Sequence, residues 1–143
     1  MPKSNGSLRL SGFPSEESFV DFAGRTRTFS LEVMDTPIGH LVLAVENAEG
    51  DDGYAFDGFS SIDPFHALGL LRGRIRKGLS VRHLMEENGR LSLTHDRMRG
   101  RVSYGGVVVD GIFLGFDQLA EILQSYEGFQ FDLKLVDSSG ELE

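Results

Sequence analysis

The chain has 143 residues, a length that suits one domain. It contains no cysteine, which excludes disulfide frameworks, thiolate zinc sites, iron–sulfur clusters and a cysteine nucleophile. No apolar run approaches the roughly 20 residues that span a bilayer, and the polar N-terminus lacks the apolar stretch of a signal peptide. We therefore expect a cytoplasmic protein that does not bind membranes.

The net charge of −8 is unevenly distributed along the chain. Residues 72–101 carry nine of the fourteen Lys and Arg against three acidic residues, a net charge of +6, whereas the segments before and after carry −7 each. This pattern indicates charge pairing between the basic segment and its acidic flanks, or a basic face for an acidic partner.

The first third of the chain predicts mainly strands. Residues 1–12 are polar and rich in Gly and Ser, which predicts a disordered tail, and residues 15–22 predict a short helical turn. Residues 26–34 alternate between apolar and polar types, which predicts a half-buried strand. Residues 40–46 predict a second strand antiparallel to it, and the aromatic residues at 54–59 predict a third.

Two helices are expected next. Asp63 can cap a helix and Pro64 suits its first position, so a helix begins here, and apolar residues at helical spacing extend it to about Gly78. Ser80 can cap a second short helix over 81–88, which ends at an Asn-Gly pair.

Strands and a helix are expected in the last third. Residues 91–94 and 101–104 predict strands joined by a polar turn. Asp110-Gly111 between two apolar triplets predicts a tight hairpin, because a type I′ turn needs positive φ at both central residues. Residues 116–123 predict an amphipathic helix that Gly128 terminates.

The C-terminal residues complete the predicted domain. Residues 129–136 alternate Phe and Leu with polar side chains, which predicts a closing strand with one buried face. Residues 138–143 predict a polar tail. Because strands are grouped and do not alternate with helices, the fold class is α+β. We expect one domain over 13–137, with a mostly antiparallel sheet of six or seven short strands packed against two or three helices.

The C-terminal 40 residues contain Gly100-Arg101-Val102, Asp110-Gly111 and the run Tyr126-Glu127-Gly128-Phe129-Gln130-Phe131. With these motifs in this order, the region resembles a family of uncharacterised bacterial domains of unknown function. In that family a Gly-Arg-Ile/Val strand precedes an Ile-Asp-Gly turn, an amphipathic helix and a Tyr-Glu-Gly-Phe-Gln-Phe strand. The matching residues here are Gly100, Arg101, Val102, Asp110, Gly111, Tyr126, Glu127, Gly128, Phe129, Gln130 and Phe131. Some relatives carry an N-terminal zinc-binding segment, which this cysteine-free chain does not match. The resemblance implies a shared fold and no known activity.

Motifs for enzymatic chemistry are weak. The sequence holds no GxSxG elbow, no phosphate-binding glycine loop and no HxH or HExxH pattern, so we assign no catalytic residue, metal ligand or cofactor. His95-Asp96 reads either as a base with its orienting carboxylate or as a polar turn. The acidic loop lacks the ligand spacing of a calcium loop and suits a solvated loop better. Its acidic residues are Glu46, Glu49, Asp51, Asp52 and Asp57.

Arginines provide the candidate binding residues. Arg72 and Arg76 are four residues apart, so they share one face of the predicted helix. The arginines at 97, 99 and 101 would point the same way on an extended segment. A pI near 4.9 and a single nearby ring argue against nucleic acid. The candidate set is Arg72, Arg76, Arg82, Arg97, Arg99 and Arg101.

Three functions follow from these observations. The first is a non-enzymatic protein-interaction or regulatory module that self-associates as a homodimer or larger oligomer. The alternative is a nucleic-acid-binding module that uses the six arginines, with affinity that falls steeply with salt. The second alternative is a hydrolytic or metal-dependent enzyme that uses His95, Asp96 and the acidic loop.

Overall fold

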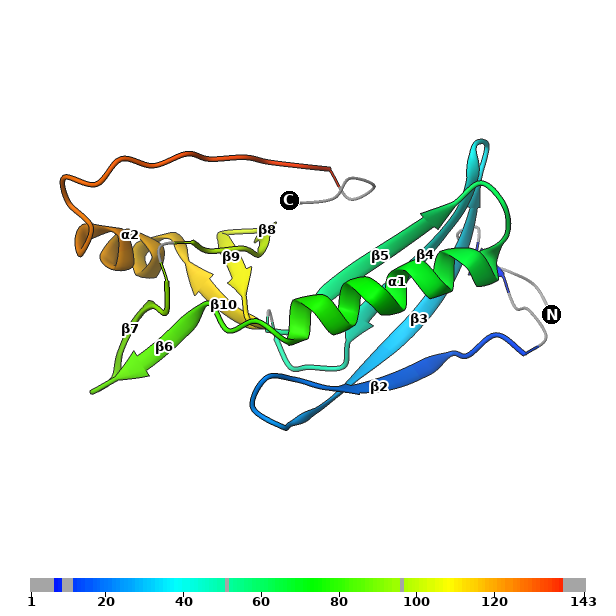
Figure 1. Ribbon diagram of the computed structural model, residues 1–143, viewed down its shortest axis with the longest axis horizontal. Coiled ribbons are helices and arrows are strands. Elements are labelled where there is room, and N and C mark those ends of the chain that lie inside the picture. The colour runs from blue at the N-terminus through cyan, green and yellow to red at the C-terminus, as the bar shows by residue number, and fades with distance from the viewer. Residues whose placement is uncertain (1–6, 9–11, 51, 96, 138–143) are drawn as a thin grey trace. The chain divides into compact units, whose positions relative to one another are not determined.

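The computed structural model describes residues 7–8, 12–50, 52–95 and 97–137 (Figure 1). These residues form ten strands and two helices. The chain divides into two compact units. Unit 1 comprises Met1–Asn47, Ala55–Ser80 and Val136–Glu143, and unit 2 comprises Ala48–Tyr54 and Val81–Leu135. Whether both units unfold together, as one domain over 13–137, stays a prediction.

Unit 1 contains a five-stranded antiparallel sheet. Its strands are β1 (Ser7–Leu8), β2 (Glu16–Val20), β3 (Thr26–Thr36), β4 (Gly39–Glu46) and β5 (Ala55–Ser60). The long strand β3 pairs with β4 on one side and with both β1 and β2 on the other, and β4 pairs with β5. The three strands predicted over residues 26–59 and the antiparallel pairing of the first two are confirmed.

The helical turn predicted for residues 15–22 is wrong, because this segment forms strand β2. Its exposure alternates, with Glu17 and Phe19 half-buried between exposed neighbours. Period-2 burial suits a strand that pairs with the next strand, β3, and this pairing prevails over a weak local helix signal.

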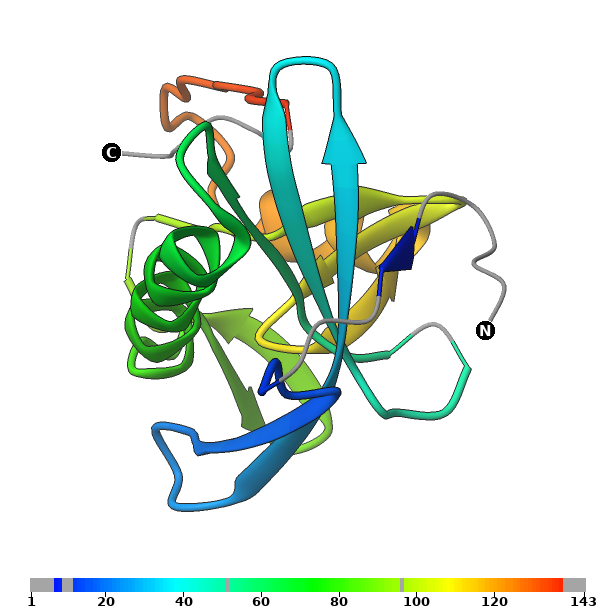
Figure 2. The ribbon, with the colours of Figure 1, turned by 90° about the vertical axis from the view of Figure 1, so that its right-hand side faces the viewer.

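Helix α1 (Pro64–Leu79) packs on the sheet of unit 1, and Figure 2 shows it to one side of the strands. The Asp63 side chain accepts a hydrogen bond from the His66 backbone N–H at 2.9 Å, so the predicted cap and helix start are confirmed. Gly58 lets β5 approach the helix, because a Cβ at this position would lie 2.5 Å from the Ala67 carbonyl oxygen. The buried helix residues are Ala67, Leu68, Leu71, Ile75 and Leu79.

Unit 2 contains two small antiparallel sheets and one helix. Its elements are β6 (Leu84–Glu87), β7 (Arg90–Leu93), β8 (Arg101–Ser103), β9 (Gly106–Val109), β10 (Ile112–Gly115) and α2 (Phe116–Gln124). The sheets are β6-β7 and β10-β9-β8. The predicted Asp110-Gly111 hairpin is confirmed by φ values of 55° and 76°. The predicted helix is confirmed by α2, but Ser125 and not Gly128 is its C-cap. Leu84, Val109, Leu114 and Ile122 form the core of the unit.

The second short helix predicted over 81–88 is wrong, because this region contains strand β6. Asn88 and Gly89 both have positive φ, 54° and 77°, and connect β6 to β7 as a tight hairpin. The same Asn-Gly pair marks a helix end or a type I′ turn, and the partner strand decides between them. The strands expected at 91–94 and 101–104 both exist, but β7 pairs with β6 and β8 pairs with β9.

The closing strand predicted at 129–136 is also wrong. These residues, called the C-terminal segment below, run as an extended trace that pairs with no described strand (Figure 1). The side chains of Phe129, Phe131, Leu133 and Leu135 are 69%, 87%, 71% and 73% exposed. Alternation predicts an extended backbone correctly, but it does not supply a partner strand.

The α+β fold class is thus confirmed, whereas the strands form three separate antiparallel sheets and not one. Within the predicted N-terminal tail, Ser7–Leu8 pairs with β3. The rest of that tail apart from Gly12, and the predicted tail at 138–143, lie outside the described residues. No helix in the described ranges is long and apolar enough to cross a membrane.

Candidate functional site

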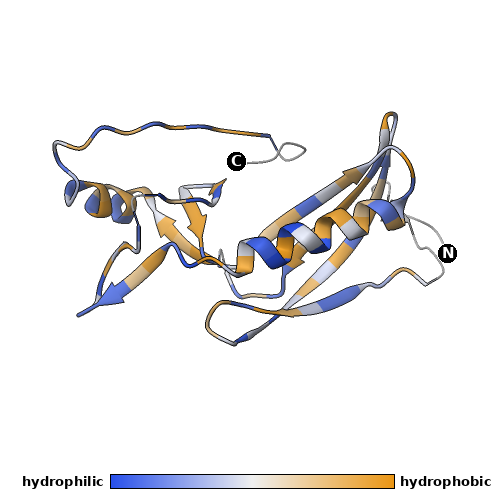
Figure 3. Cartoon of the chain, in the orientation of Figure 1, coloured by the Kyte–Doolittle hydropathy of each residue, from blue (hydrophilic) through white to orange (hydrophobic). Residues whose placement is uncertain are grey.

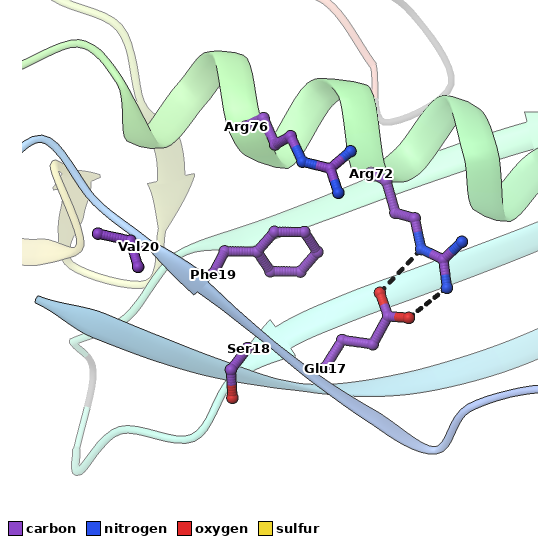
Figure 4. A pocket seen from close by; sticks show the side chains of 6 residues that line it. All are labelled: Glu17, Ser18, Phe19, Val20, Arg72 and Arg76. Carbon is purple, nitrogen blue, oxygen red and sulfur yellow. Dashed lines mark hydrogen bonds and ion pairs between the residues drawn. The ribbon is translucent and has the colours of Figure 1, made fainter. Parts of the chain in front are cut away.

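A groove of about 640 Å³ opens in unit 1 between strand β2 and helix α1 (Figure 4). The strand contributes Glu17, Ser18, Phe19 and Val20, and the helix contributes arginines 72 and 76. These two arginines belong to the set predicted from the sequence, and their four-residue spacing places both beside the groove, as the helical face requires.

Arg72 is held by an acidic partner. Its Nε donates to Glu17 Oε1 at 3.0 Å, and its Nη2 donates to Oε2 of the same carboxylate. This bidentate geometry fixes the arginine against β2, and the Glu17 hydrogen bond raises the pKa of the Arg72 guanidinium. Charge pairing between the basic segment and an acidic flank therefore occurs at this position.

Arg76 has a different environment. It is exposed, and the carbon of its guanidinium lies 5.5 Å from the centroid of the Phe19 ring (Figure 4). Phe19 in turn packs edge-on against buried Phe29, with 6.0 Å between ring centroids. The groove therefore combines an aromatic floor with a cation that is stacked on a ring and open to solvent.

The acidic residues of β5 and β4 are engaged inside unit 1. Arg74 Nη1 donates to both the backbone oxygen and Oδ1 of Asp57, each at 3.1 Å. Burial raises the pKa of Asp57, with Arg74 acting against that rise and Asp137 adding to it. Glu46 accepts from Arg27 Nη1 at 3.0 Å. Two acidic residues of the predicted metal-binding or solvated loop therefore serve as ion-pair partners.

Three hydrogen bonds hold the Asp21 carboxylate of unit 1. Its Oδ1 accepts from the backbone N–H groups of Ala23 and Arg25, and its Oδ2 accepts from Arg27 Nε at 3.0 Å. Burial acts to raise the pKa of Asp21, but the hydrogen bonds from Arg25 and Arg27 outweigh it and lower the pKa below the ordinary value of 3.8. The residue organises the β2–β3 turn.

The remaining candidate arginines lie in unit 2. Arg82 Nε donates to the backbone oxygen of Leu84 at 2.7 Å, and Arg101 Nη2 donates to the backbone oxygen of Gly53 at 3.1 Å. The Arg101 Nε is buried. Arg97 is exposed and Arg99 is half-buried. At least two of these four guanidinium groups therefore bind the protein's own backbone.

Unit 2 contains a His–Asp pair that no sequence motif indicates. His83 Nδ1 lies 3.0 Å from Asp110 Oδ1, and Asp110 Oδ2 accepts from the backbone N–H groups of His83 and Leu84 at 2.8 and 2.7 Å. Asp110 is 6% exposed and has a left-handed φ of 55°. The pair joins the β6–β7 hairpin to the β9–β10 turn, because one carboxylate satisfies buried donors from the other hairpin.

Other arrangements of catalytic type gain little support. His95 is exposed, and Asp96 lies outside the described residues. Ser60 Oγ lies 2.7 Å from His66 Nδ1, but the serine is buried and its hydroxyl also accepts from the Ile62 N–H at 3.0 Å. In the parts of the chain with assigned positions, no group of three or more His, Asp and Glu side chains could hold a metal ion.

Comparisons with known proteins divide the chain between residues 80 and 81, which is also one of the boundaries between the two structural units. Residues 11–80 match the family model described as "Domain of unknown function (DUF7686)", and residues 81–140 match "Domain of unknown function (DUF7713)". No curated protein and no solved structure matches the chain. From residue 11 to residue 140, the chain is therefore covered by two adjoining domains of unknown function.

Proposed function

We propose that the protein is a non-enzymatic interaction module that self-associates through its C-terminal segment. One observation carries this proposal: four large apolar side chains on one side of an extended segment are exposed. Hydrophobic and hydrophilic residues alternate along the segment in Figure 3. A cytoplasmic location, as expected from the sequence, is part of the proposal.

The physical argument is the cost of leaving these side chains in water. Burying one Leu or Phe side chain contributes roughly 1.5–3 kcal/mol, and the segment offers two of each on one face. An extended backbone with an apolar face can also offer its N–H and C=O groups to a ladder with another strand, apart from the Phe129 N–H, which donates to the Tyr126 oxygen at 2.9 Å. A second strand edge would satisfy both requirements at once.

Sedimentation velocity on the full chain, over a roughly hundred-fold range of concentration, tests the proposal. The wild-type chain should sediment as a dimer or larger oligomer. Phe131→Asp should shift it to the monomer, because a charge enters the apolar face. Gln130→Asp adds the same charge to the polar face and should leave the oligomer intact. A wild-type chain that stays monomeric at every concentration overturns the proposal.

A further inference from the structure

We propose that the C-terminal segment of a second copy adds as a strand to the open edge of β2, within the groove between β2 and α1. This inference rests on the proposed function and names its acceptor. Three properties of unit 1 support it: the hydrogen-bond direction of β2, the blocked edge of β5 and the surfaces beside β2. The fourth argument is that the two-sided pattern of the C-terminal segment matches these surfaces.

Hydrogen bonds at both ends of β2 show which backbone groups are used. The Leu31 N–H donates to the Ser15 oxygen and the Asp21 N–H donates to the Arg25 oxygen, both at 2.9 Å. Odd-numbered residues of β2 therefore bond to β3, since bonded and non-bonded pairs alternate in an antiparallel ladder. The N–H and C=O groups of Glu16, Ser18 and Val20 then point to the opposite edge, where no described strand pairs with them.

The other edge of the same sheet is blocked. The Asn47 N–H donates to the Thr28 oxygen at 2.9 Å, which fixes the alternation through β3 and β4. Carried on to β5, this alternation turns the backbone of Ala55, Asp57 and Phe59 outward. Arg74 already donates to the outward Asp57 oxygen at 3.1 Å. A guanidinium therefore occupies the centre of the β5 edge, and β2 remains the edge that can accept a strand.

The two faces of the sheet at β2 present different side chains. Towards α1, the Phe19 ring lies beneath the Arg76 guanidinium, beside the Glu17–Arg72 ion pair (Figure 4). On the opposite face, the Ser18 hydroxyl lies 2.8 Å from that of Thr28. Glu16 Oε2 on that face accepts from Asn47 at 3.0 Å. A strand added here meets an aromatic surface on one side and a polar surface on the other.

The C-terminal segment has this two-sided pattern. Its apolar residues would continue the Phe19–Phe29 cluster under α1, and a second ring could stack on the exposed Arg76 guanidinium. Its polar residues would continue the polar face, where Lys134 is opposite in charge to Glu16. The apolar set is Phe129, Phe131, Leu133 and Leu135, and the polar set is Gln130, Asp132 and Lys134. Each copy both gives and receives a strand, which closes a symmetric dimer.

Disulfide trapping tests the acceptor directly, because the natural chain has no cysteine to interfere. Full chains carrying Ser18→Cys and a purification tag are mixed with untagged full chains carrying Gln130→Cys, Asp132→Cys or Lys134→Cys, and then oxidised. Side chains on one face of neighbouring strands come within disulfide distance. We expect a disulfide between tagged and untagged chains at one or more polar positions. The matched control Leu133→Cys, on the apolar face, should give none.

The possible results separate this inference from the proposed function. Trapping at Ala55→Cys on β5 in place of Ser18→Cys would overturn the acceptor, and so would a dimer that traps at neither edge. Both cysteines can also be placed on the same copy. If disulfides then form only within one chain, the segment folds back on its own copy, and the second-copy partner is overturned. A chain that is monomeric without cysteines overturns both proposals.

A backbone variant provides an independent test by sedimentation. Ser18→Pro removes an N–H at the open edge and no bond to β3, so we expect dimer affinity to fall by at least about ten-fold. Ser18→Ala keeps this N–H, loses the hydroxyl contact to Thr28, and should keep the affinity. Amide hydrogen exchange in β3 and β4 establishes that both variants fold. A folded Ser18→Pro chain with unchanged affinity overturns the strand addition.

Discussion

Unit 1 and unit 2 are both built from antiparallel hairpins, yet different kinds of contact hold them together. Unit 1 has an eleven-residue strand and a sixteen-residue helix, and its fully buried side chains include Phe29, Leu71, Ile75 and Leu79. Unit 2 has strands of three or four residues, and four buried hydrophobic residues form its core. A unit with so small a core depends more on individual buried hydrogen bonds.

The two units therefore differ in where a single change should matter most. In unit 2 the Asp110 carboxylate accepts two backbone N–H groups and contacts His83. In unit 1 the corresponding weak points are the close approach at Gly58 and the ion pair at Asp21. Hydrogen exchange in peptides from each unit also reveals whether the two units unfold together.

The largest effect is expected from Asp110→Ala. It leaves the half-buried N–H of His83 and the buried N–H of Leu84 without their acceptor, so the free energy of unfolding should fall by about 3 kcal/mol. Urea unfolding followed by circular dichroism measures this change. Asp110→Asn is the matched control, because asparagine tolerates the left-handed φ and retains an acceptor oxygen. A loss below about 1 kcal/mol would contradict the central role of this carboxylate.

Faster exchange confined to unit 2 in Asp110→Ala would show that the units unfold separately. Equal acceleration in both units would support the prediction of one cooperative domain over 13–137. The comparison between the units depends on this result. If the units unfold separately, the small core of unit 2 limits the stability of the chain.

A smaller loss, about 2 kcal/mol, is expected from Gly58→Ala. The added Cβ would lie 2.5 Å from the Ala67 oxygen and 2.9 Å from Leu71, so helix and sheet must separate. Thermal unfolding measures the loss, and exchange should rise first in β5 and α1. Gly69→Ala is the matched control, since a Cβ there meets nothing within 4 Å. An unchanged melting temperature in Gly58→Ala would show that unit 1 packs more loosely than described.

The smallest effect, about 1 kcal/mol near neutral pH, is expected from Asp21→Asn. The folded-state pKa of Asp21 is lowered, so the carboxylate stabilises the fold above its unfolded-state pKa, near 3.8. This contribution disappears as pH falls through the lower, folded-state pKa. Urea unfolding at about pH 7 and about pH 3 should show a smaller difference between wild type and variant in acid. A difference that grows in acid would contradict the assigned direction.

Local sequence signals predicted much of the fold. The capped start of α1, the strands β3 and β4, the Asp110-Gly111 hairpin and helix α2 all follow from short-range rules for caps, turns and periodicity. The sequence predicted only the helical half of the candidate site, since the spacing of Arg72 and Arg76 placed both on one helical face. Their partners, Glu17 and Phe19, were hidden because they lie more than fifty residues away in the sequence.

The errors have one physical origin. Residues 15–22, 81–88 and 129–136 carry patterns that more than one backbone conformation or pairing can satisfy, and the presence or absence of a partner strand selects among them. Periodicity specified that the C-terminal segment is extended and two-faced. Only the tertiary structure decided that its apolar face stays exposed. The pattern of the segment does not specify a partner strand, and no described strand pairs with it.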